Sequence, residues 1–475
     1  MKSRFVKETF YSAPPETLFA YHERPGAFEM FLPPGSKIEI VSSASTLRPS
    51  DERVRFVVPF SFLKFAFEMQ HTRYEKNRLF VDQQVKGLFS RWRHEHHFIP
   101  GGWTEEPATL LSDRIEIGHP LLFAFNPFVA RHLKKIFEFR HRLIGQALGA
   151  LPTSGRATGR SVIVTGATGL IGSRVVRILL EQGAQVIVFA RNVEAARRRF
   201  GEQVNYATWD FDRPSEDSWR KFVPRADALL HLAGTPLFAR RWSRAFKRKM
   251  EQSRILGTRR LVEAVSESQP RPRVFVSASA VGIYGLDTRL TADEETPAAD
   301  DLLARICVGW EGEARKVAAV GVRDVQVRTG IVLSKHAGAL KSMLPLFRLG
   351  LGGWLGHPDG WINWVHLEDI ARIFVMALFC ESMQGPYNAA APEPVSMRQF
   401  AAGLARVLRR PYFMRYPTSL LKPFIGQAAD YASGGARADC RRIQQAGYRF
   451  FFEQLDAALE NSLRAAKVEC KTQPV

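Results

Sequence analysis

The chain has 475 residues and a formal net charge of +20, because 67 Lys and Arg residues outnumber 47 Asp and Glu residues. This length suggests about three domains, and 45% hydrophobic against 24% charged residues excludes a wholly disordered protein. No apolar run reaches the ~18 residues that a membrane-spanning helix needs, and the first residues lack the apolar run of a signal peptide. The excess of basic residues favours anionic partners such as phosphorylated small molecules, an anionic membrane or nucleic acid.

The four cysteines are Cys307, Cys380, Cys440 and Cys470. They are scattered and form neither a CxxC motif nor a regular framework. Spacing of this kind indicates free thiols in a reducing compartment. We therefore expect a cytoplasmic protein.

Residues 1–150 have the pattern of an α+β domain. Short segments with alternating apolar and polar residues predict strands at 80–85, 92–98 and 108–117. Apolar residues recur at helical spacing over 128–148 and predict one long helix packed on the sheet. The small, polar, Gly- and Pro-containing segment 151–159 is the predicted linker to the next domain.

After the linker, strands and helices alternate. Continuous apolar runs predict strands at 161–166, 185–190, 204–210, 227–232, 274–278 and 325–329. Helical patterns lie between them at 170–182, 247–268 and 302–319. This alternation predicts an α/β fold with a doubly wound parallel Rossmann sheet over 160–412, and a small C-terminal segment, 413–475, packed on it.

The first strand-to-helix turn of this region carries Gly166, Gly169 and Gly172. Glycines at this spacing let the backbone approach a pyrophosphate, and the helix N-terminus supplies amide donors. The turn follows an apolar strand and begins a helix, which is the context that supports a dinucleotide site. We therefore expect the loop from Gly166 through Thr168, Gly169, Leu170 and Ile171 to Gly172 to bind the cofactor.

The second strand of the sheet ends in Arg191 and has no carboxylate there. NAD sites place an acidic residue at this point, whereas an arginine accommodates the 2′-phosphate of NADP. The sequence therefore favours NADP over NAD, unless Arg191 is only a solvated turn residue. Asp210, at the end of the third strand, is expected to meet the adenine amino group.

These motifs resemble the short-chain dehydrogenases/reductases, and residues 160–463 resemble the atypical, sugar-nucleotide-epimerase-like members of that family. The motifs that carry the resemblance lie at 231–234, 241–242, 253–254, 257–258, 277–285, 307–311, 328–333, 364–369 and 385–388. The resemblance implies that Leu232, Ala233 and Gly234 also contact the cofactor. The final segment resembles the family at 447–450 and departs from it at 431–436.

Residues 1–145 resemble START-like, polyketide cyclase/dehydrase-like domains through the segments 82–87, 91–94 and 113–115. The resemblance implies a helix-grip fold, in which a sheet wraps a long helix around an apolar ligand cavity. His94, His96 and His97 raise the alternative of a metal site, since alternate residues of a strand share a face. No acidic or cysteine partner stands at ligand spacing, so we expect structural histidines and no metal.

The reductase family uses a Tyr-x-x-x-Lys pair, in which the lysine lowers the pKa of the tyrosine. At the corresponding helix this chain has Cys307 and Glu311. A carboxylate one helical turn away disfavours the thiolate, and Glu311 cannot replace the lysine cation. The usual proton relay is therefore absent, and ordinary dehydrogenase activity does not follow from the fold.

The remaining candidates for catalysis are Ser279, which the resemblance places near a substrate carbonyl, Tyr284 as an acid, and Cys307. Ser279 could instead be satisfied by the backbone, and Tyr284 could be a packed turn residue. Four residues are expected near the substrate or at its border, and they are Arg241, Trp242, His366 and Asp369. Asp369 could also be a carboxylate that stabilises a helix start.

Two readings of the function stay open. The chain is either an NADP-dependent oxidoreductase or epimerase-like enzyme acting on a small molecule, or a dinucleotide-binding sensor or carrier without turnover. Nucleic-acid binding would rest on charge alone, for example on the basic run at 240–249, which a solvated helix face also explains. We expect no nucleic-acid partner.

Overall fold

The chain divides into two units, Met1–Thr153 and Ser154–Val475. The computed structural model describes residues 2–24, 26–33, 38–44, 46–60, 63–118, 126–149, 156–213, 217–237, 240–431 and 433–464. The unit boundary falls inside the predicted linker, whose residues 151–155 lie outside the described ranges, as does Cys470. None of the described helices combines the length and apolar composition that crossing a bilayer requires.

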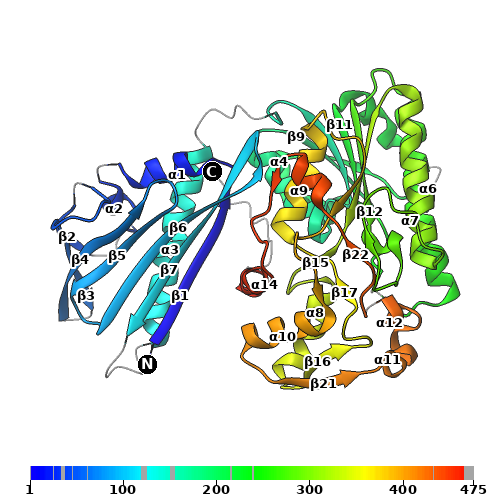
Figure 1. The fold of residues 1–475 in the computed structure, drawn as a ribbon. Coiled ribbons are helices and arrows are strands. Elements are labelled where there is room, and N and C mark those ends of the chain that lie inside the picture. Colours follow the sequence, from blue (N-terminus) through cyan, green and yellow to red (C-terminus); the bar gives the residue numbers. More distant parts are fainter. Residues whose placement is uncertain are drawn as a thin grey trace. The chain divides into compact units, whose positions relative to one another are not determined.

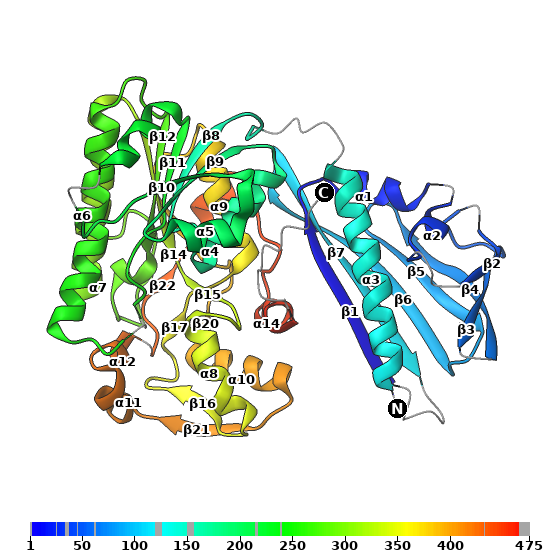
Figure 2. The same cartoon turned by 180° about the vertical axis from the view of Figure 1, so that it is seen from behind.

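Unit 1 is an antiparallel sheet with one long helix. Its strands are β1 (Lys2–Tyr11), β2 (Glu39–Ser42), β3 (Val54–Phe60), β4 (Leu63–Glu75), β5 (Leu79–Lys86), β6 (Arg91–Trp103) and β7 (Glu106–Gly118). Its helices are α1 (Pro15–His22), α2 (Ala27–Met30) and α3 (Asn126–Gly149). The strands follow the order β1-β7-β6-β5-β4-β3-β2, and α3 runs along the sheet (Figures 1 and 2).

The face that α3 turns to the sheet forms part of the core of unit 1. Leu133, Phe137 and Ile144 are buried at helical spacing, and Ile115 and Ile117 of β7 pack in the same cluster as the first two. Burial of side chains this large stabilises the domain by about 1.5–3 kcal/mol each. The predicted helix-grip architecture is confirmed, although β1 to β4 were not predicted, because charged residues interrupt their apolar pattern.

Unit 2 is a doubly wound parallel sheet, as predicted. Its strands are β8 (Ser161–Thr165), β9 (Gln185–Ala190), β10 (Asn205–Thr208), β11 (Ala228–His231), β12 (Val274–Ala280), β14 (Arg323–Thr329) and β19 (Gly385–Ala389). They follow the order β10-β9-β8-β11-β12-β14-β19. The seventh strand, β19, was not predicted, because its Gly, Pro and Asn residues are poor strand formers.

Helices cover both faces of this sheet (Figures 1 and 2). The helices are α4 (Leu170–Glu181), α5 (Val193–Phe200), α6 (Arg244–Glu267), α7 (Leu302–Arg315) and α9 (Leu367–Phe379). α6 packs with α7 on one face, and α4 packs with α9 on the other. The predicted helix 302–319 ends earlier than expected, because the chain continues from α7 into a 3-10 turn over Lys316–Val320.

Shorter elements complete unit 2. The strands are β13 (Thr291–Ala292), β15 (Ile331–Leu333), β16 (Gly352–Leu355), β17 (Trp361–Ile362), β18 (Trp364–His366), β20 (Val395–Ser396), β21 (Tyr412–Tyr416), β22 (Arg437–Ala438) and β23 (Tyr448–Arg449). The helices are α8 (Gly338–Arg348), α10 (Met397–Leu408), α11 (Thr418–Ile425), α12 (Ala428–Tyr431), α13 (Arg441–Gln445) and α14 (Leu455–Arg464). The predicted division at residue 412 falls inside β21, which pairs with β16.

Candidate functional site

The loop between β8 and α4 brings the backbone into position for a phosphate. Gly166 has a φ of +67°, a conformation that favours glycine, and a Cβ there would lie 2.7 Å from the carbonyl carbon of Leu232. A Cβ on Gly172 would lie 2.3 Å from the carbonyl oxygen of Gly166. Gly169 is the N-cap of α4. A phosphate can therefore approach the amides at the start of this helix.

The ends of β8 and β11 are tied together beside this loop. The hydroxyl oxygen of Thr165 accepts hydrogen bonds from the amides of Leu232 and Ala233, both at 3.2 Å. The same oxygen lies 2.7 Å from Nδ1 of His231. Burial lowers the pKa of His231 to about 3, with a smaller contribution from Arg254, so the imidazole is neutral at pH 7. The predicted segment 232–234 is thereby held against the glycine loop.

The two residues predicted to determine cofactor preference follow neighbouring strands. Arg191 follows β9 and is exposed, and Asp210 lies half-buried just after β10. Because β9 and β10 pair in parallel, both residues lie at the same sheet edge as the glycine loop. Arg199 of α5 donates a hydrogen bond to the carbonyl of Thr168 at 2.8 Å. The sequence analysis did not predict this contact between α5 and the glycine loop, because Arg199 belongs to no recognisable motif.

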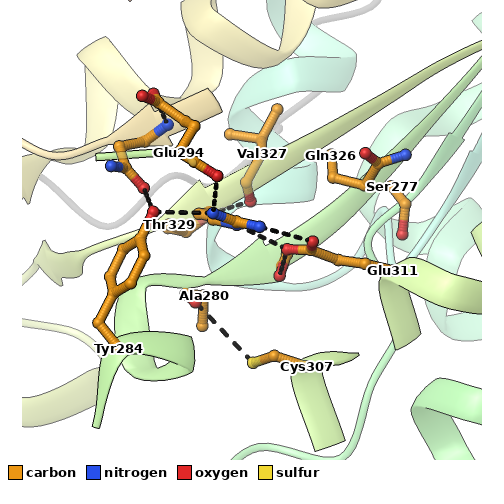
Figure 3. A network of polar contacts seen from close by, with 12 residues as sticks. Ser277, Ala280, Tyr284, Glu294, Cys307, Glu311, Gln326, Val327 and Thr329 are labelled. Atoms are coloured by element: carbon orange, nitrogen blue, oxygen red, sulfur yellow. Dashed lines mark hydrogen bonds and ion pairs between the residues drawn. The ribbon is translucent and has the colours of Figure 1, made fainter. Parts of the chain in front are cut away.

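A buried polar network joins β12, α7 and β14 (Figure 3). The Ser279 hydroxyl donates to Oε1 of Glu311 at 2.7 Å. Arg328 holds both oxygens of Glu311 from Nε and Nη2, at 2.8 and 2.9 Å. The Glu311 and Arg328 side chains are only 2% and 5% exposed. Ser279 is therefore satisfied by a side chain rather than by the backbone.

Tyr284 belongs to the same network. Its hydroxyl donates to Oδ1 of Asn388 at 2.7 Å and accepts from Nη1 of Arg328 at 2.8 Å. The backbone N–H of Asn388 in turn donates to Oε1 of Glu294 at 2.7 Å. Burial raises the pKa of Tyr284 to about 12, against the lowering effect of Arg328. The phenol therefore stays protonated at neutral pH. Its hydroxyl already donates one hydrogen bond, to Asn388, and accepts one, from Arg328.

Cys307 lies one helical turn before Glu311 on α7, and its sulfur is 3.8 Å from the carbonyl oxygen of Ala280. Burial, and then the negative charge of Glu311, raise the pKa of the Cys307 thiol to about 11. At neutral pH the group is therefore a thiol rather than a thiolate. A thiol in this state can give up a proton but is a poor nucleophile.

Arg254 of α6 brings a cation to this region, which sequence reasoning missed. Its guanidinium donates to the carbonyls of Thr235 and Met250 at 3.1 and 3.2 Å. A Cβ on Gly234 would lie 3.4 Å from its central carbon. Burial lowers the pKa of Arg254, and Cys307 acts in the opposite direction. Within the described ranges no ion pair joins Arg254 to a carboxylate. In the sequence, the only indication of this residue was the family motif at 253–254.

Two residues predicted near the substrate differ in exposure. Arg241 is exposed. Trp242 is 5% exposed, its indole N–H donates to the carbonyl of Leu237 at 2.7 Å, and its ring packs 5.3 Å from that of Tyr431. Trp242 therefore fills an apolar cluster and does not present its ring for stacking.

His366 and Asp369, the other two, lie buried at the start of α9. Nδ1 of His366 accepts from the amide of Glu368 at 3.2 Å and so caps the helix. Oδ1 of Asp369 accepts from the Tyr448 hydroxyl at 3.0 Å and from the Phe451 amide at 2.9 Å. Asp369 therefore holds the segment after α13. The motif predicted the position of this carboxylate but not its partners.

The pKa of Asp369 predicts a pH effect on stability. Burial raises it to about 7, whereas an unfolded aspartate titrates near ~3.9. The folded chain therefore binds this proton more tightly, and the stabilisation present below about pH 4 is lost as the pH rises to 7. The total is ~4 kcal/mol. An Asp369→Asn variant, neutral throughout, lacks this slope. Denaturant unfolding of both proteins from pH 4 to 8 measures the difference.

The comparison with the variant is needed because His366 acts in the opposite direction. Burial lowers the pKa of His366 to about 4, so its contribution to stability rises with pH over the same range. His366 is present in both proteins and cancels in the difference. A free-energy difference between wild type and Asp369→Asn that stays constant from pH 4 to 8 would contradict the prediction.

The histidines of β6 divide between the two faces of the sheet, as strand alternation requires. His94 and His96 are buried on β6, whereas His97 points to the opposite side and pairs with Glu95. The argument against a metal was the lack of an acidic partner, and it was wrong. Asp82 of β5 pairs directly with His94 and lies 3.1 Å from Nε2 of His96. Strand pairing supplies the carboxylate that sequence spacing cannot reveal.

Comparisons with known proteins show the family of this chain. The model of the NAD dependent epimerase/dehydratase family matches residues 162–390. An epimerase family protein SDR39U1 homolog of Arabidopsis thaliana is 34% identical over 314 residues, which cover 65% of this chain and 88% of that protein. The chain belongs to the epimerase family. Epimerase family protein YfhF of Bacillus subtilis is 31% identical, over 65% of this chain and 99% of its own.

Two solved structures are similar to this epimerase-family chain. Human epimerase family protein SDR39U1, crystallised with NADPH, has a TM-score of 0.58 and 29% identity, covering 64% of this chain and all of that one. A nucleoside-diphosphate sugar epimerase from Corynebacterium glutamicum has a TM-score of 0.55 and 25% identity. The match covers 97% of this chain and 90% of that one. A polyketide cyclase/dehydrase and lipid transport model matches residues 11–148, and a domain model of unknown function matches 416–462.

Proposed function

We propose that this epimerase-family chain is an NADP-binding oxidoreductase or epimerase-like enzyme acting on a small molecule. The observation that carries the proposal is the glycine loop, where Cβ atoms on Gly166 and Gly172 would collide with backbone. Such a loop leaves the amides at the start of α4 open to a pyrophosphate. The relative solved with NADPH supports the choice of cofactor.

A bound nicotinamide supplies hydride chemistry, so the chain itself has to handle a proton. We assign proton donation to the Cys307 thiol, which stays protonated because its pKa is about 11. The buried cation of Arg254 favours the thiolate that is left after the proton has moved. Glu311 and Arg328 fix Ser279 at the end of β12. In this scheme the Ser279 oxygen, whose proton goes to Glu311, positions the substrate by accepting a hydrogen bond, and Tyr284 holds Arg328.

The NADP preference is tested by an Arg191→Ala variant. We expect the wild type to bind NADPH more tightly than NADH, because a guanidinium can pair with the 2′-phosphate. A hydrogen bond to a charged group is worth about 1.5–3 kcal/mol, so the variant should bind NADPH about 10- to 100-fold more weakly. Its affinity for NADH should stay unchanged. Calorimetric titration with both cofactors measures these affinities.

Arg305→Ala is the matched control, because Arg305 is an exposed arginine on α7 that pairs with Asp300. This variant should keep the affinity of the wild type for both cofactors. Equal affinities of the wild-type protein for NADPH and NADH would contradict the assignment of Arg191. Equal losses for the two cofactors in Arg191→Ala would do the same.

The alternative, a dinucleotide-binding sensor or carrier without turnover, is favoured by one observation. The hydroxyls of Ser279 and Tyr284 are both engaged in the buried network. An assay of NADPH oxidation with a panel of carbonyl compounds and sugar nucleotides separates the two functions. Turnover that is lost in Cys307→Ala, with NADPH binding retained, supports the enzyme. Tight binding without turnover on any member of the panel supports the sensor.

We propose in addition that unit 1 holds an apolar small molecule, since the family that matches it is described by cyclase and lipid-transport functions.

The described cysteines Cys307, Cys380 and Cys440 are free thiols. Free buried thiols suit a reducing compartment, which supports a cytoplasmic location.

A further inference from the structure

Five side chains of types that can bind a metal ion lie on one face of the unit 1 sheet. His71 of β4, Asp82 of β5 and His94 of β6 stand opposite one another in register. His96 lies two residues after His94 and pairs with Asp113 of β7. Residues directly opposite each other in antiparallel strands point to the same side of the sheet. The strand register therefore gathers these side chains from four strands.

Three of these side chains place donor atoms at the spacing of a metal site. Oδ2 of Asp82 lies 3.1 Å from Nε2 of His96 and 3.6 Å from Nδ1 of His94. Nitrogen and oxygen ligands at ~2.1 Å from a tetrahedral Zn²⁺ ion are separated by about 3.4 Å from one another. The ligand atoms of the three residues all lie within 4.8 Å of one another. An ion between them therefore needs little rearrangement.

Asp113 stands where a metal site places its supporting carboxylate. Its Oδ1 lies 3.3 Å from Nε2 of His94 and 2.6 Å from Nδ1 of His96, the ring nitrogens that face away from Asp82. Metal-bound histidines commonly donate their other N–H to a carboxylate, which fixes the tautomer. His141 of α3 holds Oδ2 of Asp113 at 2.7 Å, and Arg140 lies 3.3 Å from Nδ1 of His96.

With neutral rings, hydrogen bonds alone leave this cluster incompletely satisfied. Each of the two rings lies between two carboxylates, but a neutral imidazole has a single N–H to donate. In addition, His71 brings a third imidazole to the Asp82 carboxylate, with its Nδ1 2.6 Å from Oδ1 of Asp82. A cation on the Asp82 side of the rings would bind the ring nitrogens that carry no proton.

We propose that Asp82, His94 and His96 bind a divalent transition-metal ion, with Zn²⁺ as the best match. Two imidazoles and one carboxylate are ligands that zinc accepts, and three protein ligands leave a fourth position for water, His71 or an exogenous ligand. The Asp82 side chain is 19% exposed, whereas Asp113 is fully buried. The ion can therefore enter from the Asp82 side. The site would give unit 1 a Lewis acid on the sheet face that α3 covers.

The test is a titration of the full chain after chelator treatment, with Zn²⁺ by calorimetry and with Co²⁺ by visible absorption. We expect one ion per chain and the intense d–d bands of tetrahedral Co²⁺. His94→Ala and His96→Ala should each lower the Zn²⁺ affinity at least 100-fold. Asp113→Asn, which removes only the supporting charge, should lower it about 10- to 100-fold.

His97→Ala is the matched control, because His97 lies on the same strand and pairs with Glu95 instead. This variant should bind Zn²⁺ like the wild type. Far-UV circular dichroism and thermal unfolding of each variant report whether unit 1 is folded. Failure of the wild type to bind one Zn²⁺ or Co²⁺ ion overturns the proposal. Binding that His94→Ala and His96→Ala leave unchanged overturns it as well.

Discussion

Replacing Gly172 with alanine is expected to weaken NADPH binding about 100-fold. The added Cβ would lie 2.3 Å from the carbonyl oxygen of Gly166 and 2.8 Å from Cα of Ala167, and backbone atoms cannot yield as the tip of a side chain can. The loop has to move by a fraction of an ångström or more, and displacements of about 1 Å in a binding site cost about 100-fold. Fluorescence titration with NADPH measures the loss.

Gly312→Ala provides the control for this substitution. Gly312 lies within α7, and a Cβ there would meet nothing within 4 Å. Alanine is favoured over glycine in a helix by up to about 1 kcal/mol, so this variant should bind NADPH normally and be slightly more stable. If Gly172→Ala bound NADPH as tightly as Gly312→Ala does, the glycine loop would not be the pyrophosphate site.

Replacing Arg328 with methionine is expected to lower the free energy of unfolding of the chain by about 3–5 kcal/mol. Arg328 supplies two hydrogen bonds to Glu311 and one each to Tyr284 and the carbonyl of Glu294. Without it, the Glu311 carboxylate stays buried, with Ser279 and the half-exposed Arg315 as partners. Breaking a buried pair on one side costs more than the pair contributes. Urea denaturation of both proteins measures the change.

Two further variants separate this effect from a general loss of charge. The double variant Glu311→Met/Arg328→Met should be more stable than Arg328→Met alone, because it leaves no unpaired buried charge. Arg305→Met should leave the unfolding midpoint unchanged, since both Arg305 and its partner Asp300 are exposed. An Arg328→Met variant as stable as Arg305→Met would show that the network does not hold the end of β12.

Regular patterns made the fold of unit 2 predictable. The buried parallel strands are unbroken apolar runs, so residues 185–190 were predicted with the bounds of β9 itself. Elements without such a pattern were missed. β19 has the sequence GPYNA and is a strand only because β14 offers it a partner along its length. Tertiary pairing overrides weak strand propensity in such cases.

The site was predictable to the extent that backbone chemistry determines it. The glycine loop could be predicted, because the spacing of its glycines is itself the requirement. The partners of Ser279 could not, since Glu311 and Arg328 come from other elements and meet it only in the folded sheet. The same holds for Asp82 and His94, which strand register brings together. The family's lysine is replaced by Glu311 in this chain, and the cation that lowers the pKa of Cys307 is Arg254 of α6, a role that no sequence pattern indicates.

The central claim, that a phosphate-bearing dinucleotide binds at the amides that begin α4, has a direct test. The folded full-length protein is titrated with NADPH in a calorimeter. We expect a saturable heat with one cofactor bound per chain, which competition with excess NADP⁺ removes. A folded chain that produces no binding heat with either NADPH or NADH would contradict the claim.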